Sequence, residues 1–143
     1  MLTAGTFALI VGAALSASAA LAHLACILVG ERAYRFMGAG ERMARAAQAG
    51  RLQPTLVTLV ISSVLFGWSA YALSGASVIA HLPLTRFALV AICAVYLIRA
   101  VTFPLLKPSF PENSRTFWLV SSGICLAIGL VHLYGIVALW PAL

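Results

Sequence analysis

Seven polar side chains near one end of the apolar runs are the strongest candidates for chemistry in this sequence. They are His23, Glu31, Tyr34, Thr58, Ser62, Tyr96 and Arg99. An arginine combined with a histidine and several hydroxyls suits an anion such as a lipid phosphate. We expect Arg99 at the centre, paired with Glu31 or with the anion itself. Thr58 and Ser62 are four residues apart and therefore share a helix face.

A purely structural interpretation of these residues also remains open. Arg99 lies near the end of an apolar run, from which a long side chain can reach the lipid headgroups. Serine and threonine hydroxyls inside membrane helices commonly bond a carbonyl of their own helix. His23 needs a partner under either interpretation, because an unpartnered imidazole in lipid is costly.

His132 is a second deeply placed polar residue, and it lies between Gly129 and Gly135. These small neighbours leave room for a ligand or admit a neighbouring helix, and both interpretations stay open. A haem held by two histidines needs both imidazoles at one level. A rise of about 1.5 Å per residue places His23 and His132 at different depths, so we expect no haem. Either histidine as the base of a membrane-embedded enzyme remains an alternative.

Missing residue types exclude several other chemistries. The chain has no Asp, and Glu41 and Glu112 fall in predicted loops, so paired-carboxylate catalysis and Ser-His-Asp triads lack a member. The three cysteines form no C-x-x-C motif, so neither a dithiol relay nor a structural zinc site is predicted. We expect no metal and no other cofactor.

The elements that must position the candidate residues are predicted to be four membrane-spanning helices. Of the 143 residues 63% are hydrophobic, and the nine basic and three acidic residues fall almost entirely between long apolar runs. Each run can cross a hydrocarbon core of roughly 30 Å, which takes about 20 helical residues. We therefore predict an all-α, four-helix bundle forming a single integral membrane domain, residues 1–143. The predicted spans are about 6–29, 54–74, 83–103 and 115–139.

The basic residues predict how the bundle is oriented. They gather in the connection 31–53 and around the third connection, whereas the connection 75–82 has none. Because cationic flanks stay on the cytoplasmic side, we expect a multi-pass protein of the inner (plasma) membrane with both termini outside. The first run has no Lys or Arg before it, which favours a retained span over a cleaved signal peptide. Nucleic-acid binding is not predicted, because membrane topology explains the net charge of +6.

The connection 31–53 is too long for a simple turn. Residues 31–37 are predicted to continue the first helix out of the bilayer, and Gly38-Ala39-Gly40 to end it. Residues 41–49 are predicted to form a short amphipathic cytoplasmic helix whose arginines meet anionic inner-leaflet headgroups, each contributing about 1 kcal/mol. A docking surface for a partner protein has the same sequence pattern. At the start of the last span, Asn113 or Ser114 is expected to be the cap.

Small residues recur at every fourth position of the first span, at Ala4, Ala8, Gly12, Ser16 and Ala20. Such a ridge lets helix backbones approach closely in lipid. It is therefore either central in the bundle or a seam between two copies of the chain.

Two classes of function follow from these patterns. In the first, the protein binds or translocates an amphiphilic small molecule with an anionic head, such as a lipid, an isoprenoid phosphate or a quinone-like molecule. The site would then comprise the seven residues around Arg99, with His132 as a further contact. In the second, the chain is a non-catalytic membrane subunit or a homo-oligomer that packs through the small-residue face. The expected partners are membrane lipids and a second copy or a larger membrane complex.

Overall fold

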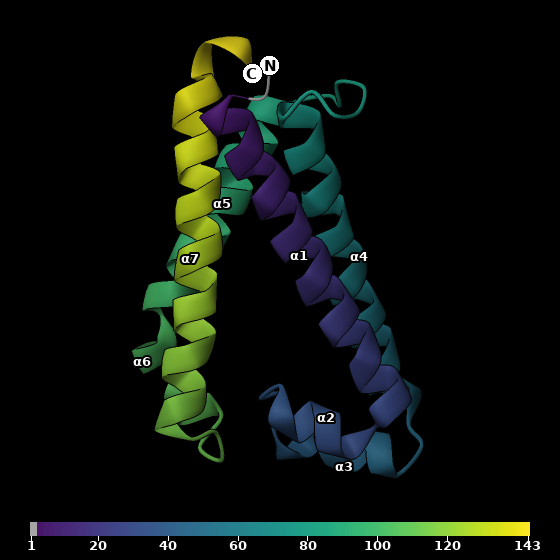
Figure 1. The fold of residues 1–143 in the computed structure, drawn as a ribbon. Coiled ribbons are helices and arrows are strands. Elements are labelled where there is room, and N and C mark those ends of the chain that lie inside the picture. Colours follow the sequence, from purple (N-terminus) through teal and green to yellow (C-terminus); the bar gives the residue numbers. More distant parts are fainter. Residues whose placement is uncertain (1–2) are drawn as a thin grey trace.

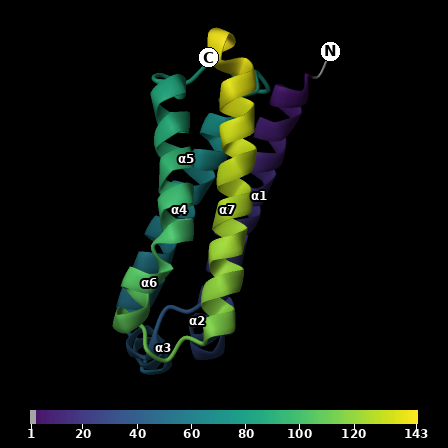
Figure 2. The same ribbon diagram turned by 90° about the vertical axis from the view of Figure 1, so that its left-hand side faces the viewer.

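The computed structural model describes residues 3–143, and every regular element in that range is a helix. Four long helices make up most of the fold (Figures 1 and 2): α1 (Ala4–Val29), α4 (Leu52–Gly75), α5 (Thr85–Val101) and α7 (Arg115–Leu139). The short helices between and after them are α2 (Glu31–Phe36), α3 (Glu41–Gln48), α6 (Phe103–Leu106), η1 (Lys107–Ser109) and η2 (Trp140–Ala142). The all-α prediction is confirmed.

Three helices are long and apolar enough to cross a membrane: α1, α4, and α7 together with η2. A fourth crossing is present if α5 and the segment 103–109 count as one span, although the two are bent by 64°. Length and composition therefore indicate a membrane protein. The helices also expose many large apolar side chains, of which Leu28 is 89% exposed.

The third predicted span ends earlier than its apolar pattern suggests. We expected a helix to Phe103, but α5 stops at Val101 and the chain bends before α6. Pro104 explains the bend, because proline has no N–H to donate and its ring clashes with the carbonyl four residues earlier. α5 alone is 17 residues, or about 25 Å, so it is shorter than a typical hydrocarbon core.

The first helix also ends earlier than predicted. α1 stops at Val29 because Gly30 has a φ of +81°, and residues 31–36 form the separate helix α2. The predicted break at Gly38 and Gly40 is present, with φ values of +72° and +89°. The short amphipathic helix is present as α3. At the start of α7 the cap is Ser114, whose Oγ accepts a hydrogen bond from the N–H of Phe117.

The long helices form two pairs that meet near the chain ends. α1 packs along α4 and α5 packs along α7, while contacts between α1 and α7 join the pairs. Figure 1 shows the pairs close together near both termini and farther apart toward α2 and α3. One apolar cluster forms the joint, with Leu9, Ala72, Leu89 and Ile136 contributed by α1, α4, α5 and α7 respectively.

At the opposite end, residues 38–41 contact residues 110–117, and we call this contact the latch. The backbone N–H of Glu41 donates to Oε1 of Glu112 at 2.6 Å, and Nδ2 of Asn113 donates to the carbonyl of Gly38 at 3.1 Å. The ring of Phe117 lies directly against Gly38. The latch therefore connects the segment between α2 and α3 with the start of α7, so the two helix pairs are joined at both ends.

Glu41 and Glu112 at this end accept hydrogen bonds, whereas Glu31 has only an ion-pair contact. Arg35 donates two hydrogen bonds of 2.9 Å to Glu41 and lies 3.5 Å from Glu31. The hydrogen bond from Arg35 lowers the pKa of Glu41 from its usual value. Hydrogen bonds from backbone N–H groups, that of Glu41 first, lower the pKa of Glu112. Both groups are therefore ionised at neutral pH.

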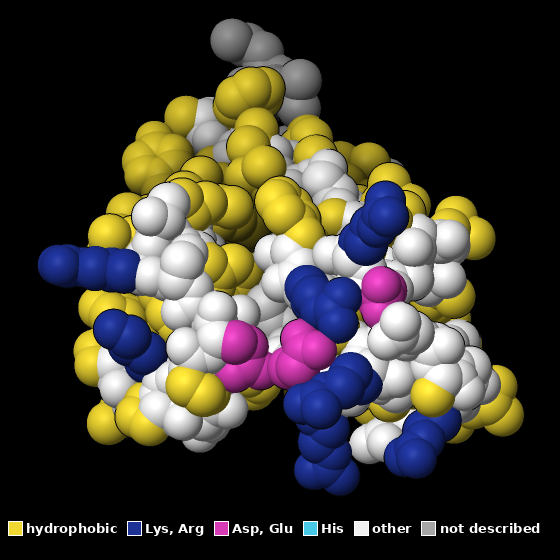
Figure 3. Space-filling view, turned by 90° about the horizontal axis from the view of Figure 1, so that it is seen from below, with side chains coloured by type: hydrophobic (Ala, Val, Ile, Leu, Met, Phe, Trp, Pro, Cys, Tyr) yellow, Lys and Arg dark blue, Asp and Glu magenta, His cyan; other side chains and the backbone are white. Residues whose placement is uncertain are grey.

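Positive charge gathers at the end of the molecule that carries α2 and α3 (Figure 3). The basic residues of the connection 31–53, together with Lys107 and Arg115, lie in the elements at this end, and both termini lie at the other (Figure 2). Figure 3 also shows acidic side chains between the basic ones. The predicted segregation of charge to one end of the bundle is thus present.

The small-residue ridge is only partly buried, and its buried part faces the other helices of the same chain. Gly12, Ser16 and Ala20 are buried, whereas Ala4 is exposed. A step of four residues turns about 40° beyond a full helical turn, so the ridge rotates away from any one neighbour. Gly12 lies against His132 of α7, and the carbonyl of Ala20 accepts a hydrogen bond from Ser62 of α4. This stretch of α1 is therefore covered within the chain.

Candidate functional site

The structure places several of the seven candidate residues in separate contacts. The Tyr34 and Thr58 hydroxyls are 3.1 Å apart and both side chains are buried, so this pair joins α2 to α4. Ser62 Oγ donates to a backbone carbonyl of α1 at 3.2 Å. His23 Nδ1 lies 2.8 Å from the carbonyl of Ala19 in its own helix. These groups already have partners, and each holds helices together or caps its own backbone.

Tyr96 and His132 lie together in the middle of the bundle. The hydroxyl of Tyr96 is 2.9 Å from Oγ of Ser16, and its ring centroid is 5.6 Å from that of His132. His132 is fully buried, and its Nδ1 lies 2.9 Å from the carbonyl of Ile128. If Nδ1 carries the proton, Nε2 is left as an unpartnered acceptor, and Gly12 covers the ring. His132 thus packs at a helix contact, and Tyr96 is the candidate residue beside it.

Arg99 interacts with α7 and not with Glu31. Its Nη2 donates to Oγ of Ser121 at 3.1 Å, and its guanidinium carbon lies 5.4 Å from the ring centroid of Trp118. Glu31 is instead paired with Arg35. Among residues 3–143, no carboxylate lies within 4.0 Å of Arg99. Its positive charge is therefore stabilised by an aromatic ring and one hydroxyl.

Three buried polar groups on Arg99 and on the first turns of α7 have no hydrogen-bond partner. They are Nη1 of Arg99, Nε1 of Trp118 and Oγ of Ser122. Only five such atoms occur in the part of the chain that the structure describes, and three of them belong to these residues. Trp118 is 2% exposed, and Ser122 follows it by four residues on the same helix face. We call Arg99, Trp118, Ser121 and Ser122 the donor cluster.

The donor cluster is suited to an anion. Guanidinium and indole groups only donate, and hydroxyls can donate to an anion as well. Leaving a buried donor unpaired costs about 1–3 kcal/mol, and more for a charged group. An anionic group that accepts from several of these donors removes that cost, and hydrogen bonds between charged groups are the strong ones.

Sequence reasoning found Arg99 but missed its neighbours on α7. A tryptophan near the end of a membrane span is typical of the aromatic belt at the membrane interface, which needs no other partner. The available signal was the spacing of Trp118 and Ser122 on one face near the start of α7. α7 is antiparallel to α5, so that start lies beside the end of α5, where Arg99 lies.

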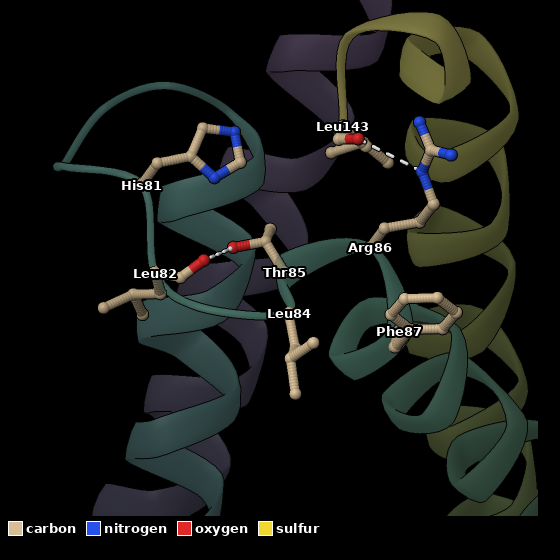
Figure 4. A pocket seen from close by; sticks show the side chains of 7 residues that line it. All are labelled: His81, Leu82, Leu84, Thr85, Arg86, Phe87 and Leu143. Atoms are coloured by element: carbon tan, nitrogen blue, oxygen red, sulfur yellow. Dashed lines mark hydrogen bonds between the residues drawn. The ribbon is translucent and has the colours of Figure 1, made fainter.

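A pocket of about 400 Å³ at the end with the chain termini is less suited to an anion (Figure 4). Its cation is Arg86, which donates to the carbonyls of Leu143 and Trp140 at 3.1 Å each. Figure 4 shows Arg86 pointing toward Leu143, with His81 on the opposite side. Nε and Nη2 of Arg86 are thus already used to bind backbone carbonyls in η2 and just after it.

Comparisons with protein-family models, with curated proteins and with solved structures found no match to this chain.

Proposed function

We propose that this is an integral membrane protein that binds or translocates an amphiphile with an anionic head, and that the head lies against the donor cluster. One observation carries the proposal: buried polar groups on Arg99, Trp118 and Ser122 have no hydrogen-bond partner, and no carboxylate among residues 3–143 lies within 4.0 Å of the Arg99 guanidinium. An anionic head with several oxygens accepts from such a set at once.

The surroundings of the donor cluster support an amphiphile over a fully soluble anion. Ile98, Leu119 and Val120 are next to cluster residues in sequence and are 53–58% exposed. They offer an apolar surface along which a hydrocarbon tail can pack through van der Waals contacts. An amphiphile with its head at Arg99 and its tail along α5 and α7 would contact both the polar donor cluster and this apolar surface.

We also propose that the protein lies in the inner (plasma) membrane with the latch end in the cytoplasm. The support is that basic residues gather at this end and that cationic flanks stay cytoplasmic. In an Arg32→Cys variant with its three native cysteines replaced by serine, a thiol reagent that cannot cross membranes should label position 32 only after permeabilisation. Labelling of intact cells would show the opposite orientation.

Replacing Arg99 by Gln should weaken the binding of an anionic amphiphile about tenfold or more, because a charge-assisted hydrogen bond worth roughly 1.5–3 kcal/mol is lost. The measurement is a thermal-shift titration of the protein in a neutral maltoside detergent with dodecyl phosphate. A Trp118→Phe variant removes the indole N–H together with the five-membered ring and retains one aromatic ring beside Arg99, so a smaller loss in the same direction is expected.

The matched control is Arg115→Gln. It also removes one positive charge, but from an exposed position at the start of α7, near the donor cluster. This control should bind dodecyl phosphate as the unchanged protein does. Equal affinity of the Arg99→Gln variant and the unchanged protein would place the head elsewhere. An equal loss of affinity for dodecyl phosphate in both variants would mean that only surface charge attracts the amphiphile.

A further inference from the structure

α3 and the turn that leads into α4 form a second basic site, away from the donor cluster. A pocket of about 370 Å³ lies there. It is lined by Arg42, Arg45, Ala46, Ala49, Arg51 and Gln53. Three of these six residues carry a guanidinium and none carries a carboxylate. The lining is thus strongly cationic.

The guanidinium groups of this pocket are poorly neutralised by the protein itself. Within residues 3–143, Arg42 and Arg51 form no ion pair, and Arg45 has only a contact of 3.6 Å with Glu41. Glu41 in turn is held by two hydrogen bonds from Arg35. Like charges gathered around one cavity repel, so an anion with more than one negative charge would stabilise the arrangement.

The chemistry of the pocket favours phosphate. Guanidinium groups present paired N–H donors that match phosphate oxygens, and Gln53 adds an amide donor. A phosphomonoester carries nearly two negative charges at neutral pH, since its second pKa is about 6. A phosphodiester carries only one.

The position of the pocket indicates a lipid as the source of this phosphate. Arg51 immediately precedes α4, whose first exposed apolar residues are Leu52 and Leu56, at 73% and 59% exposed. The pocket therefore lies where the polar end of the molecule meets the apolar surface of a candidate span. A phosphate held by the arginines can have its acyl chains along α4.

We propose that the pocket of Arg42, Arg45 and Arg51 binds the phosphomonoester headgroup of a membrane lipid, with its tails along α4. The site lies on α3 and α4, whereas the donor cluster lies on α5 and α7. The proposal for this pocket can therefore be tested independently of the function proposed above.

The test is a native mass spectrometry titration of the whole chain in neutral detergent with phosphatidate. We expect one saturable phosphatidate per protein, bound at least tenfold more tightly than phosphatidylglycerol. An Arg42→Gln/Arg51→Gln variant should weaken phosphatidate binding at least tenfold. The matched control, Arg32→Gln/Arg115→Gln, removes two equally exposed charges outside the pocket and should retain full binding.

A second variant tests the pocket without removing any charge. Ala49→Trp fills the pocket from an exposed position without changing any charged residue, so it should also abolish the specific phosphatidate complex. Arg99→Gln should leave that complex unchanged, which separates this site from the donor cluster.

Three results would overturn the proposal. Equal losses in the pocket variant and its control would reduce the binding to surface charge. Equal affinities for phosphatidate and phosphatidylglycerol would remove the preference for a monoester. Displacement of phosphatidate by an equal concentration of glycerol 3-phosphate would make the pocket a site for a soluble phosphate.

Discussion

Replacing Gly12 by Leu is expected to lower the Tm of the detergent-solubilised protein by about 5–10 °C. A Cβ at Gly12 would lie 2.7 Å from Cε1 of His132, whose ring is fully buried. A larger side chain must push α1 away from α7 or displace the ring. Overpacking of this kind costs typically 1–3 kcal/mol, and the Tyr96–Ser16 hydrogen bond one helical turn away is also at risk.

The matched control is Gly123→Leu in α7, where a Cβ would meet no atom within 4 Å. Both variants exchange glycine for leucine inside a long helix, so the control should show an unchanged or slightly raised Tm. The Gly12→Leu/His132→Ala double variant should be less destabilised than the sum of its single changes, because the ring that clashes is gone. Additive effects would mean that Gly12 and His132 are not in contact.

The same variant tests whether this face of α1 joins copies of the chain. Because Gly12 and Ser16 contact α7 and α5 of their own chain, Gly12→Leu should leave the oligomeric state of the folded fraction unchanged. Dissociation of an oligomer by this substitution would instead place Gly12 at an interface between subunits.

Replacing Gly38 by Ala should open the latch and destabilise the protein by about 2–5 kcal/mol. Gly38 has a φ of +72°, which costs a non-glycine residue about 1–2 kcal/mol. A Cβ there would also overlap the ring of Phe117, which adds about 1–3 kcal/mol of overpacking. The measurements are the Tm and the amide hydrogen exchange of residues 38–41 and 110–117, which should speed up together.

Gly50→Ala separates the two costs of the Gly38 substitution. Gly50 has a similar φ of +67°, but a Cβ there meets nothing within 4 Å. It should therefore show only the backbone cost and unchanged exchange in residues 110–117. If both variants lose the same stability and neither changes that exchange, Phe117 does not hold the latch closed.

Hydrophobic patterning and local chemistry were enough to predict the long helices and α3. Long uncharged runs predicted the four long helices, and Gly38 and Gly40 predicted the break before α3. Ser114 was identified as a possible cap from residue type alone. The bend before Pro104 was predicted only as an end, because the direction of the chain after a proline depends on what it packs against.

Side-chain partners could be predicted only within one helix and not between helices. Sequence spacing brought Arg99 and Glu31 to the same end of the bundle, and the tertiary structure paired Glu31 with Arg35 and Arg99 with Trp118 and Ser121. The choice depends on which face of α5 meets α7, and no spacing along a single helix contains that information.

The amino-acid sequence by itself determined the all-helical fold class, the lengths of the apolar runs and the segregation of charge to one end. Each of these is a property of contiguous residues. The tertiary structure alone decided the burial of Gly12 under His132, the latch and the contacts of Arg99 with Trp118 and Ser121. These features join residues far apart in the chain, and their free energy depends on the angle and register at which helices cross.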